Sequence, residues 1–395
     1  MSACAAVRRR LRGILLLRLV AHAATMDELA SLRRTVLEAE FRSFRGRWPG
    51  MPGFEALTRD VIPHSLKLAL TMNGTINFWG HKLPPAQHRH AAHASESVVL
   101  IAGGQVANDL QVGVRVTRGR PQWTRELFAA YSSLLTSGKS VSPGHYPHAA
   151  EDILLALQCF AMPPQFGAAT APRRECAGTT AGKRTGTSSG AAILPDGLRA
   201  RAAVWSSISP WVEGMLLHHG MEAVTTVDYN TPDIADDVGV NVSTLGQEAL
   251  AGVYADSGGK GYFDLIISFS GLEHDGLGRY GDPINPDGDL AAMSEIRSML
   301  RAGGLVLLGI PTARHDNIVY PGHREYGPVR LPKMIAGFQM LGRVWDGKVV
   351  HGGLEAAEMP PLLYAGKGAV TGAHGKNATD DRWQHEQVLV LQKKQ

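Results

Sequence analysis

Glu273, His274 and Asp275 stand together in a polar, glycine-rich stretch, Ser268–Pro283 (S-F-S-G-L-E-H-D-G-L-G-R-Y-G-D-P). Carboxylate and imidazole groups can transfer protons, and the same groups can ligate a metal ion. Adjacent side chains rarely converge on one ion without distant partners, so we expect no metal here. We predict instead that Glu273 or His274 acts as a catalytic base.

Three glycines of this stretch, Gly276, Gly278 and Gly281, spell G-x-G-x-x-G. This fingerprint binds a dinucleotide phosphate only where a helix opens directly from it. Pro283 and Pro286 follow, and they disfavour a helix start within the glycines. The pattern therefore indicates a shaped loop, and an NAD-dependent oxidoreductase is the least favoured reading.

Strands alternating with helices must position this stretch. The pattern predicts an α/β fold, with a Rossmann-like, mostly parallel sheet, helices on both faces and an antiparallel last strand. The predicted strands are Arg201–Trp205, Ala223–Asp228, Val238–Val242, Phe263–Phe269, Gly304–Ile310 and Gln387–Leu391, and the main helices are Trp123–Leu135, His148–Phe160, Trp211–His219 and Asp289–Leu300.

In such a sheet, ligands bind at the carboxyl ends of the strands where the strand order reverses. The loop after the first predicted strand carries Ser206, Ser207 and Ser209, and Pro210 opens the next helix. Small hydroxyl residues allow a ligand to approach, less freely than the glycines usual in a nucleotide loop. A serine cap before a proline-started helix explains the same residues equally well.

Asp228 ends the second predicted strand. An acid at this place typically accepts hydrogen bonds from ribose hydroxyls, and it follows the first loop by about 20 residues, as that geometry requires. A lone Asp after a strand is also a common turn former. Since no phosphate site accompanies Asp228, a nucleoside without phosphates fits as well as a dinucleotide.

Two polar patches could contact a substrate. The glycine-rich stretch supplies Arg279, Tyr280 and Asp282, at the carboxyl end of strand Phe263–Phe269. A later patch, Tyr320–Pro328, could fold over the same edge or form only a rigid surface loop. Its candidate residues are His323, Arg324 and Tyr326.

By composition and predicted secondary structure, the chain of 395 residues divides into three parts. Residues 1–25 carry five arginines and no acid, which suits organelle targeting or secretion. A basic first helix of a cytoplasmic protein is the alternative, and the apolar run is too short to span a bilayer. Residues 26–145, beginning with a predicted helix Met26–Arg47, form a mainly helical cap. Residues 146–395 form the sheet domain, with a flexible insertion at about 167–197.

Composition excludes several classes of function. The formal net charge of +4 is slight and the basic residues are spread out, so we expect no nucleic-acid partner. Cys4, Cys159 and Cys176 favour neither a disulfide scaffold nor a thiolate zinc site. The sequence predicts neither the identity of a methyl acceptor nor the oligomeric state.

The order of elements resembles class I methyltransferases that use S-adenosylmethionine. L-E-H after Phe263–Phe269 and R-A-G-G before G-L-V-L-L-G-I carry this resemblance. More closely, S-P-W-V-E, V-D-Y-N, L-E-H-D-G-L-G-R-Y-G-D-P and H-R-E-Y-G are similar to the methyltransferase-like domain-of-unknown-function family 268. The resemblance covers roughly Tyr146 to Val350 without the insertion.

The resemblance implies S-adenosylmethionine as cofactor and an unknown small molecule, or another acceptor, as substrate. The loop Ser206–Ser209 would face the methionine moiety, Asp228 with Tyr229 the ribose, and Ser243 or Thr244 the adenine. Ser268, Ser270 and Glu273 would lie between cofactor and acceptor. Class I enzymes generally have a glycine-rich first loop, whereas no glycine lies between Arg201 and Glu213. A non-catalytic methyltransferase-like binding or scaffold protein is therefore the alternative.

Overall fold

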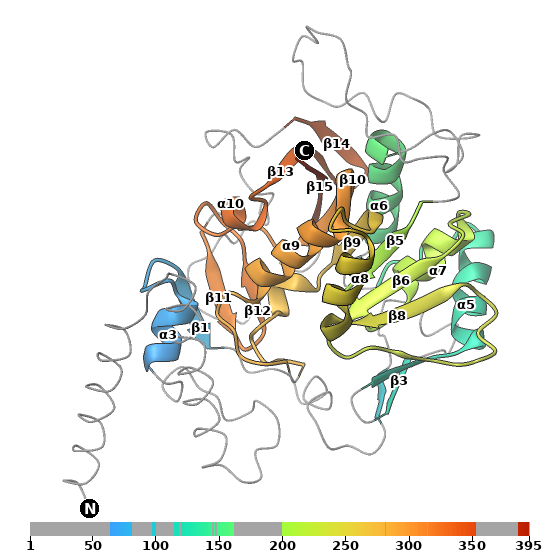
Figure 1. Ribbon diagram of the computed structural model, residues 1–395, viewed down its shortest axis with the longest axis horizontal. Coiled ribbons are helices and arrows are strands. Elements are labelled where there is room, and N and C mark those ends of the chain that lie inside the picture. Colours follow the sequence, from blue (N-terminus) through green and yellow to red (C-terminus); the bar gives the residue numbers. More distant parts are fainter. Residues whose placement is uncertain are drawn as a thin grey trace, which may run out of the picture.

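A computed structural model describes the fold (Figure 1). The described residues are 64–80, 97–99, 114–117, 120–143, 146, 148–161, 200–280, 282–313, 315–352 and 386–394. The predicted targeting segment, the predicted helix Met26–Arg47 and the predicted insertion at 167–197 lie outside them.

The core of the fold is an eight-stranded sheet with the order β14-β13-β15-β10-β9-β5-β6-β8. Its five parallel strands are β5 (Ala202–Trp205), β6 (Val224–Asp228), β8 (Val242–Gly246), β9 (Phe263–Phe269) and β10 (Leu300–Ile310). Beyond β10, antiparallel pairing joins β15 (Gln387–Lys393), β13 (Phe338–Trp345) and β14 (Lys348–His351). The predicted α/β sheet, mostly parallel with an antiparallel last strand, is confirmed.

The strand order reverses between β5 and β9. From β5 the chain adds β6 and β8 on one side, and later β9 and β10 on the other. The loops after β5 and β9 therefore meet at the carboxyl edge, the place where open α/β sheets bind ligands. Because β15 is antiparallel to β10, with Gln387 opposite Ile310, the start of β15 lies at this edge too.

Helices cover both faces of the sheet (Figure 1). On one face, α5 (Arg125–Thr136), α6 (Ala149–Ala156) and α7 (Trp211–His218) share a core with Ala202 and Val204 of β5. On the other face, α8 (Leu250–Asp256), α9 (Gly288–Met299) and α10 (Leu331–Met334) pack around Ala203 and Trp205. Burial on both faces explains why these strands are apolar without interruption.

Besides α3 (His64–Leu70) and α5, the described part of the region 26–145 contributes strands to two smaller sheets. Parallel pairing joins β1 (Asn77–Gly80), beside α3, to β11 (Asn317–Tyr320), which pairs with β12 (His323–Glu325). The second sheet has the order β2 (Ser97–Val99), β3 (Val114–Thr117), β4 (Arg120–Trp123), β7 (Asp233–Ile234). This region was expected to be mainly helical, yet its described residues include four short strands.

Two local predictions need correction. The predicted strand Val238–Val242 begins only at Val242, because Val238 packs into a small core with Trp123 and Phe128. Cys159 follows α6 in a π-helical turn (Leu157–Ala161) and is disulfide-bonded, although the sequence did not favour a disulfide scaffold. None of the described helices has the length and apolar content that crossing a bilayer requires.

Candidate active site at the carboxyl edge

Two serines mark the point where the strand order reverses. Ser206 follows β5 and Ser270 follows β9, and both have left-handed backbones, with φ of +63° and +50°. Neighbouring strands hold them, since the amide of Ser206 donates to the carbonyl of Val227 at 2.9 Å and that of Ser270 to Gly309 at 2.9 Å. Left-handed non-glycine residues are uncommon and concentrate at functional sites.

Gly271 lets the two loops touch. Its φ of −126° suits any residue, but a Cβ at this position would lie 2.6 Å from the Cβ of Ser206. We expect Gly271→Ala to push the loops apart and lower the free energy of unfolding by roughly 1–3 kcal/mol, measured in urea. Ser206→Gly, which removes the clashing Cβ and the left-handed strain, should recover most of the loss in the double variant. A loss that Ser206→Gly leaves unchanged would contradict this contact.

The serines of the first loop bond within the protein. Ser209 Oγ lies 2.6 Å from the hydroxyl of Tyr131 on α5, and Ser207 Oγ donates to the carbonyl of Ser209 at 3.1 Å. Beneath the loop, Glu213 of α7 is fully buried and accepts from Thr226 Oγ1 at 2.7 Å. The loop is thus held rigid by hydroxyl groups where glycines are usual.

Glu213 should make folding stability depend on pH. Burial raises its pKa from 4.5 to about 7. The unfolded chain therefore releases this proton at lower pH than the folded chain, and stability falls as pH rises between these values. In Glu213→Gln, the free energy of unfolding measured in urea should fall less steeply between pH 4.5 and 7. The difference in slope between the two proteins should correspond to at most one proton. Parallel slopes for the two proteins would refute this assignment.

Asp228 lies at the carboxyl end of β6, as predicted. Its Oδ1 accepts from the amide of Asn230 at 2.7 Å, and burial, opposed by backbone hydrogen bonds and reinforced by the charge of Asp282, raises its pKa to about 7. Asn230 Nδ2 donates to the carbonyl of Tyr280 at 3.0 Å, which ties this loop to the glycine-rich stretch. Tyr229 is 49% exposed, an aromatic surface beside the acid.

Two other predicted cofactor contacts lie within strands. Ser243 is the second residue of β8, where its Oγ is 3.1 Å from Thr225 Oγ1. It precedes Gly246, the last residue of the strand, by three positions, which is about 10 Å of strand. Ser268 is fully buried inside β9, and its Oγ has no hydrogen-bond partner within the described residues.

Ser270 contacts one hydroxyl and two carboxyl groups, and those of Tyr146 and Glu386 come from distant parts of the chain. Its Oγ lies 2.5 Å from the hydroxyl of Tyr146, 2.7 Å from Glu273 Oε1 and 3.2 Å from Glu386 Oε1. Burial raises the pKa of Glu273 to about 7, and burial with the nearby charge of Glu273 raises that of Glu386 far above its usual range. We call Tyr146, Ser270, Glu273 and Glu386 the Ser270 cluster.

Sequence analysis missed Tyr146 and Glu386. The only signal for Glu386 was an acid directly before the apolar run of the last strand.

His274 is buried beside this cluster. Its Nδ1 lies 2.5 Å from the carbonyl oxygen of Gly322, so Nδ1 carries the proton and donates it. Its Nε2 then faces Glu273 Oε1 at 3.4 Å. Burial, with the positive charge of Arg279, holds the pKa of His274 well below its usual range, so the ring is neutral.

The glycine-rich stretch closes on its own carboxylate. Asp282 accepts hydrogen bonds from the amides of Gly276 at 2.8 Å, Gly278 at 3.1 Å and Tyr280 at 3.2 Å. Amides that would cradle a phosphate are therefore already bonded, and α9 begins only at Gly288. The geometry agrees with a shaped loop and leaves no helix end for a pyrophosphate.

Comparison with known families adds one match. Residues 199–357 match the family described as "Caenorhabditis protein of unknown function, DUF268". The resemblance to this family is confirmed. The DUF268 segment contains β5 to β14, with both switch-point loops and Asp228, whereas Tyr146 and Glu386 lie outside it. No curated protein matches the sequence.

Solved structures with partial similarity include methyltransferases. One is a Burkholderia thailandensis 1,6-didemethyltoxoflavin-N1-methyltransferase bound to S-adenosylhomocysteine, with 15% identity, 50% of this chain and 72% of that chain covered, and a TM-score of 0.32. Another is the N-methyltransferase NodS of Bradyrhizobium japonicum WM9, with 12% identity, coverage of 50% and 79%, and a TM-score of 0.28. The class of fold follows from the strand order of this chain itself.

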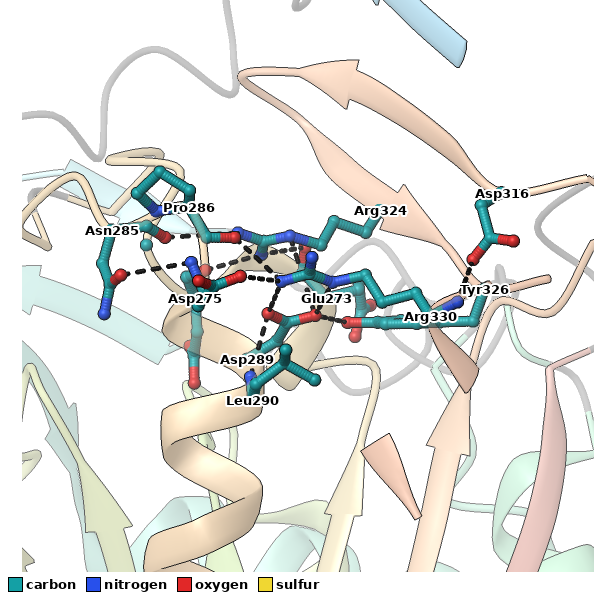
Figure 2. A network of polar contacts seen from close by, with 12 residues as sticks. Glu273, Asp275, Asn285, Pro286, Asp289, Leu290, Asp316, Arg324, Tyr326 and Arg330 are labelled. Carbon is teal, nitrogen blue, oxygen red and sulfur yellow. Dashed lines mark hydrogen bonds and ion pairs between the residues drawn. The ribbon is translucent and has the colours of Figure 1, made fainter. Parts of the chain in front are cut away.

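Within the DUF268 segment, Arg324 and Tyr326 belong to a buried network (Figure 2). Arg324 donates to the carbonyls of Asp275 at 2.6 Å and Pro286 at 3.1 Å, and its side chain is fully buried. Tyr326 donates to Asp289 Oδ2 at 3.0 Å. We expected both to bind a substrate, but the structure places them where they fix the glycine-rich stretch against α9.

The other predicted substrate residues differ in exposure. His323 is buried, with Nε2 3.7 Å from Glu325 Oε1. Arg279 and Tyr280 are half-buried, and the Arg279 guanidinium lies 5.1 Å from the centre of the Tyr280 ring. In the part of the chain that the structure describes, no group of three or more His, Cys, Asp or Glu side chains is arranged to hold a metal ion.

Asp282→Ala should loosen the glycine-rich stretch. Three amides would lose their acceptor, and we expect a loss of about 1–3 kcal/mol in the free energy of unfolding, measured in urea. Asp282→Asn keeps one acceptor oxygen and should lose less. Equal stability of wild type and Asp282→Ala would show that the carboxylate does not close this loop.

Proposed function

We propose that this protein is an S-adenosylmethionine-dependent methyltransferase. The observation that carries the proposal is the switch point between β5 and β9, where the serine loop, Asp228 and Ser270 converge at one edge of the sheet. This is the place and the order in which a Rossmann-like sheet binds an adenosine ligand.

The residues present suit such a ligand. Asp228 would accept hydrogen bonds from the ribose hydroxyls, and the exposed ring of Tyr229 could lie against the adenine. Burial raises the pKa values of Glu213, Asp228 and Glu273, so this edge has carboxyl groups that a cationic ligand would help to ionise. When bound, S-adenosylmethionine supplies an electrophilic methyl group on a positively charged sulfur.

Ser206 and Gly271 are in contact where the two loops meet. The methionine moiety of S-adenosylmethionine would therefore lie against hydroxyl and backbone groups. The protein's own task is then to align the acceptor and to receive its proton. Glu273 and His274 both stand next to Ser270, and of the two Glu273 has an unpartnered, buried oxygen, Oε2, among the described residues. This supports Glu273 as the base and His274 as the group that positions it.

S-adenosylhomocysteine tests the proposal through its effect on thermal unfolding. A ligand that binds only the folded chain stabilises it by about 2.7 kcal/mol at a hundredfold excess over its dissociation constant. We expect a rise in Tm with S-adenosylhomocysteine, a smaller one with adenosine and none with NAD. No shift at millimolar S-adenosylhomocysteine would instead favour a non-catalytic binding or scaffold protein.

A further inference from the structure

One hydroxyl of the Ser270 cluster bridges two carboxyl groups. Ser270 has one hydroxyl proton, yet Glu273 Oε1 and Glu386 Oε1 both lie within its reach, at 2.7 and 3.2 Å. The side chain of Glu273 is fully buried, and Glu386 is 5% exposed. Two negative charges bridged by one hydroxyl, away from water, repel each other strongly, so the pair retains a proton around neutral pH.

The surroundings of the two carboxyls differ. Glu273 faces the positive charges of Arg279 and Arg324, which favour its ionised form. Burial and the charge of Glu273 disfavour the ionised form of Glu386, and the hydrogen bonds of Ser270 and Tyr146 do not outweigh them. The proton therefore resides mainly on Glu386.

Glu386 also lines a small pocket at the carboxyl edge, on the α6 side of the sheet. Tyr146, Phe269 and Trp345 supply aromatic walls, and the Tyr146 and Phe269 rings meet edge to face at 5.3 Å. His148, Asp152 and Asp346 are the other charged or titratable groups there. The Asp152 carboxylate already accepts from the amides of Asp346 and Gly347, at 2.9 and 2.8 Å.

Glu386 differs from Asp152 in one respect that points to a ligand. Its Oε2 is completely buried and has no hydrogen-bond partner within the described residues. A buried carboxyl oxygen without a partner, in the wall of a pocket, is an unused acceptor or donor for a polar group. The same carboxyl reaches Ser270 at the switch point through its other oxygen, so it connects the pocket to the proposed cofactor position.

We propose that the Glu273–Glu386 pair is the proton acceptor for a methyl acceptor whose hydroxyl or amine proton enters this pocket. The inference rests on the proposed function. In the step, a lone pair of the acceptor atom forms the bond to the methyl carbon, and the carbon–sulfur bond breaks with its electrons remaining on sulfur. The proton of the acceptor atom passes to a carboxylate of the pair, which the charge of S-adenosylmethionine has ionised, and the pair regains one shared proton.

Proton release on ligand binding tests this pair without a known acceptor. S-adenosylmethionine carries one positive charge more than S-adenosylhomocysteine, and that charge should expel the shared proton. Calorimetric titrations of the full chain near pH 7, in buffers of different ionisation enthalpy, give the protons released by each ligand. We expect wild type to release more with S-adenosylmethionine, and we expect this difference to be smaller, by up to one proton, in Glu386→Gln and in Glu273→Gln.

Glu222→Gln, at an exposed acid before β6, serves as the control and should behave as wild type. Equal release of protons with both ligands in wild type, or an unchanged difference in Glu386→Gln, would overturn the inference while the proposed function stands. If neither ligand binds, the proposed function fails. The infrared carbonyl band of a protonated carboxyl in D₂O then tests, without any ligand, whether Glu273 and Glu386 share a proton. In spectra of wild type minus each Gln variant near pH 7, the shared proton predicts the loss of one carboxyl band in both variants. A spectrum that neither variant changes would refute sharing.

Discussion

Asp289→Asn is expected to lower the free energy of unfolding by about 3–5 kcal/mol, because it leaves two buried guanidinium groups without their shared counter-ion. Asp289 is fully buried and bonds Arg330 through both carboxylate oxygens, one of them at 2.7 Å from Nε. Arg324 Nε lies 3.7 Å from Asp289 Oδ2, and Tyr326 donates to it (Figure 2). Urea unfolding of the two proteins at neutral pH measures the loss.

The matched control is Asp233→Asn. Asp233 pairs with Arg120 at 2.8 Å, but both side chains are about half exposed, and such pairs contribute about 0–1 kcal/mol. Equal losses from the two substitutions would contradict the structural role of the buried network.

The effect of Asp289→Asn should shrink in acid. Burial alone raises the pKa of Asp289, but Arg324, Arg330 and the Tyr326 hydroxyl outweigh it and hold the pKa below its usual value. Ionised Asp289 therefore stabilises the fold above the pKa of the unfolded chain, and this contribution is lost as pH falls through the folded pKa.

Asp228→Ala is expected to abolish the thermal stabilisation by S-adenosylhomocysteine. The carboxylate at the end of β6 is the proposed partner of the ribose hydroxyls. Losing its charge-assisted hydrogen bonds to the two hydroxyls should weaken the binding free energy by about 1.5–3 kcal/mol for each bond. This would shift the dissociation constant by at least tenfold. Titration of Tm against ligand concentration gives both constants.

Asp237→Ala provides the control for this binding experiment. Asp237 is an exposed acid beyond β7 in the same connection between β6 and β8. It should leave the affinity unchanged. A wild-type affinity in Asp228→Ala would remove Asp228 from the proposed site.

The central strands were predictable because their surroundings are uniform. Phe263–Phe269 is covered on both faces, so burial alone selects its residues and the apolar run shows the strand directly. Val238–Val242 (V-G-V-N-V) is also rich in a β-branched residue, but Val238 packs against Trp123 of a different sheet, and only β8 from Val242 onward joins the main sheet. Local composition cannot distinguish these two kinds of burial.

The candidate site was predictable where residues directly follow strands. Asp228, Ser206 and Ser270 stand at strand ends, so the parallel order brings them to one edge. Tyr146 and Glu386 are 124 and 116 residues from Ser270, and they reach it only because α6 covers this edge and β15 inserts between β10 and β13. Arg324 was predicted to contact a substrate because a charged side chain is usually exposed. In the structure it is buried, where Asp289 and backbone carbonyl oxygens bind its guanidinium group.

A crystal structure of the full chain with S-adenosylhomocysteine tests most directly whether the switch point is a cofactor site. We predict ligand density at the carboxyl edge between β5 and β9, with the ribose hydroxyls on Asp228 and the sulfur near Ser270. Ligand bound elsewhere on the chain, or an empty edge at saturating concentrations of S-adenosylhomocysteine, would contradict the account.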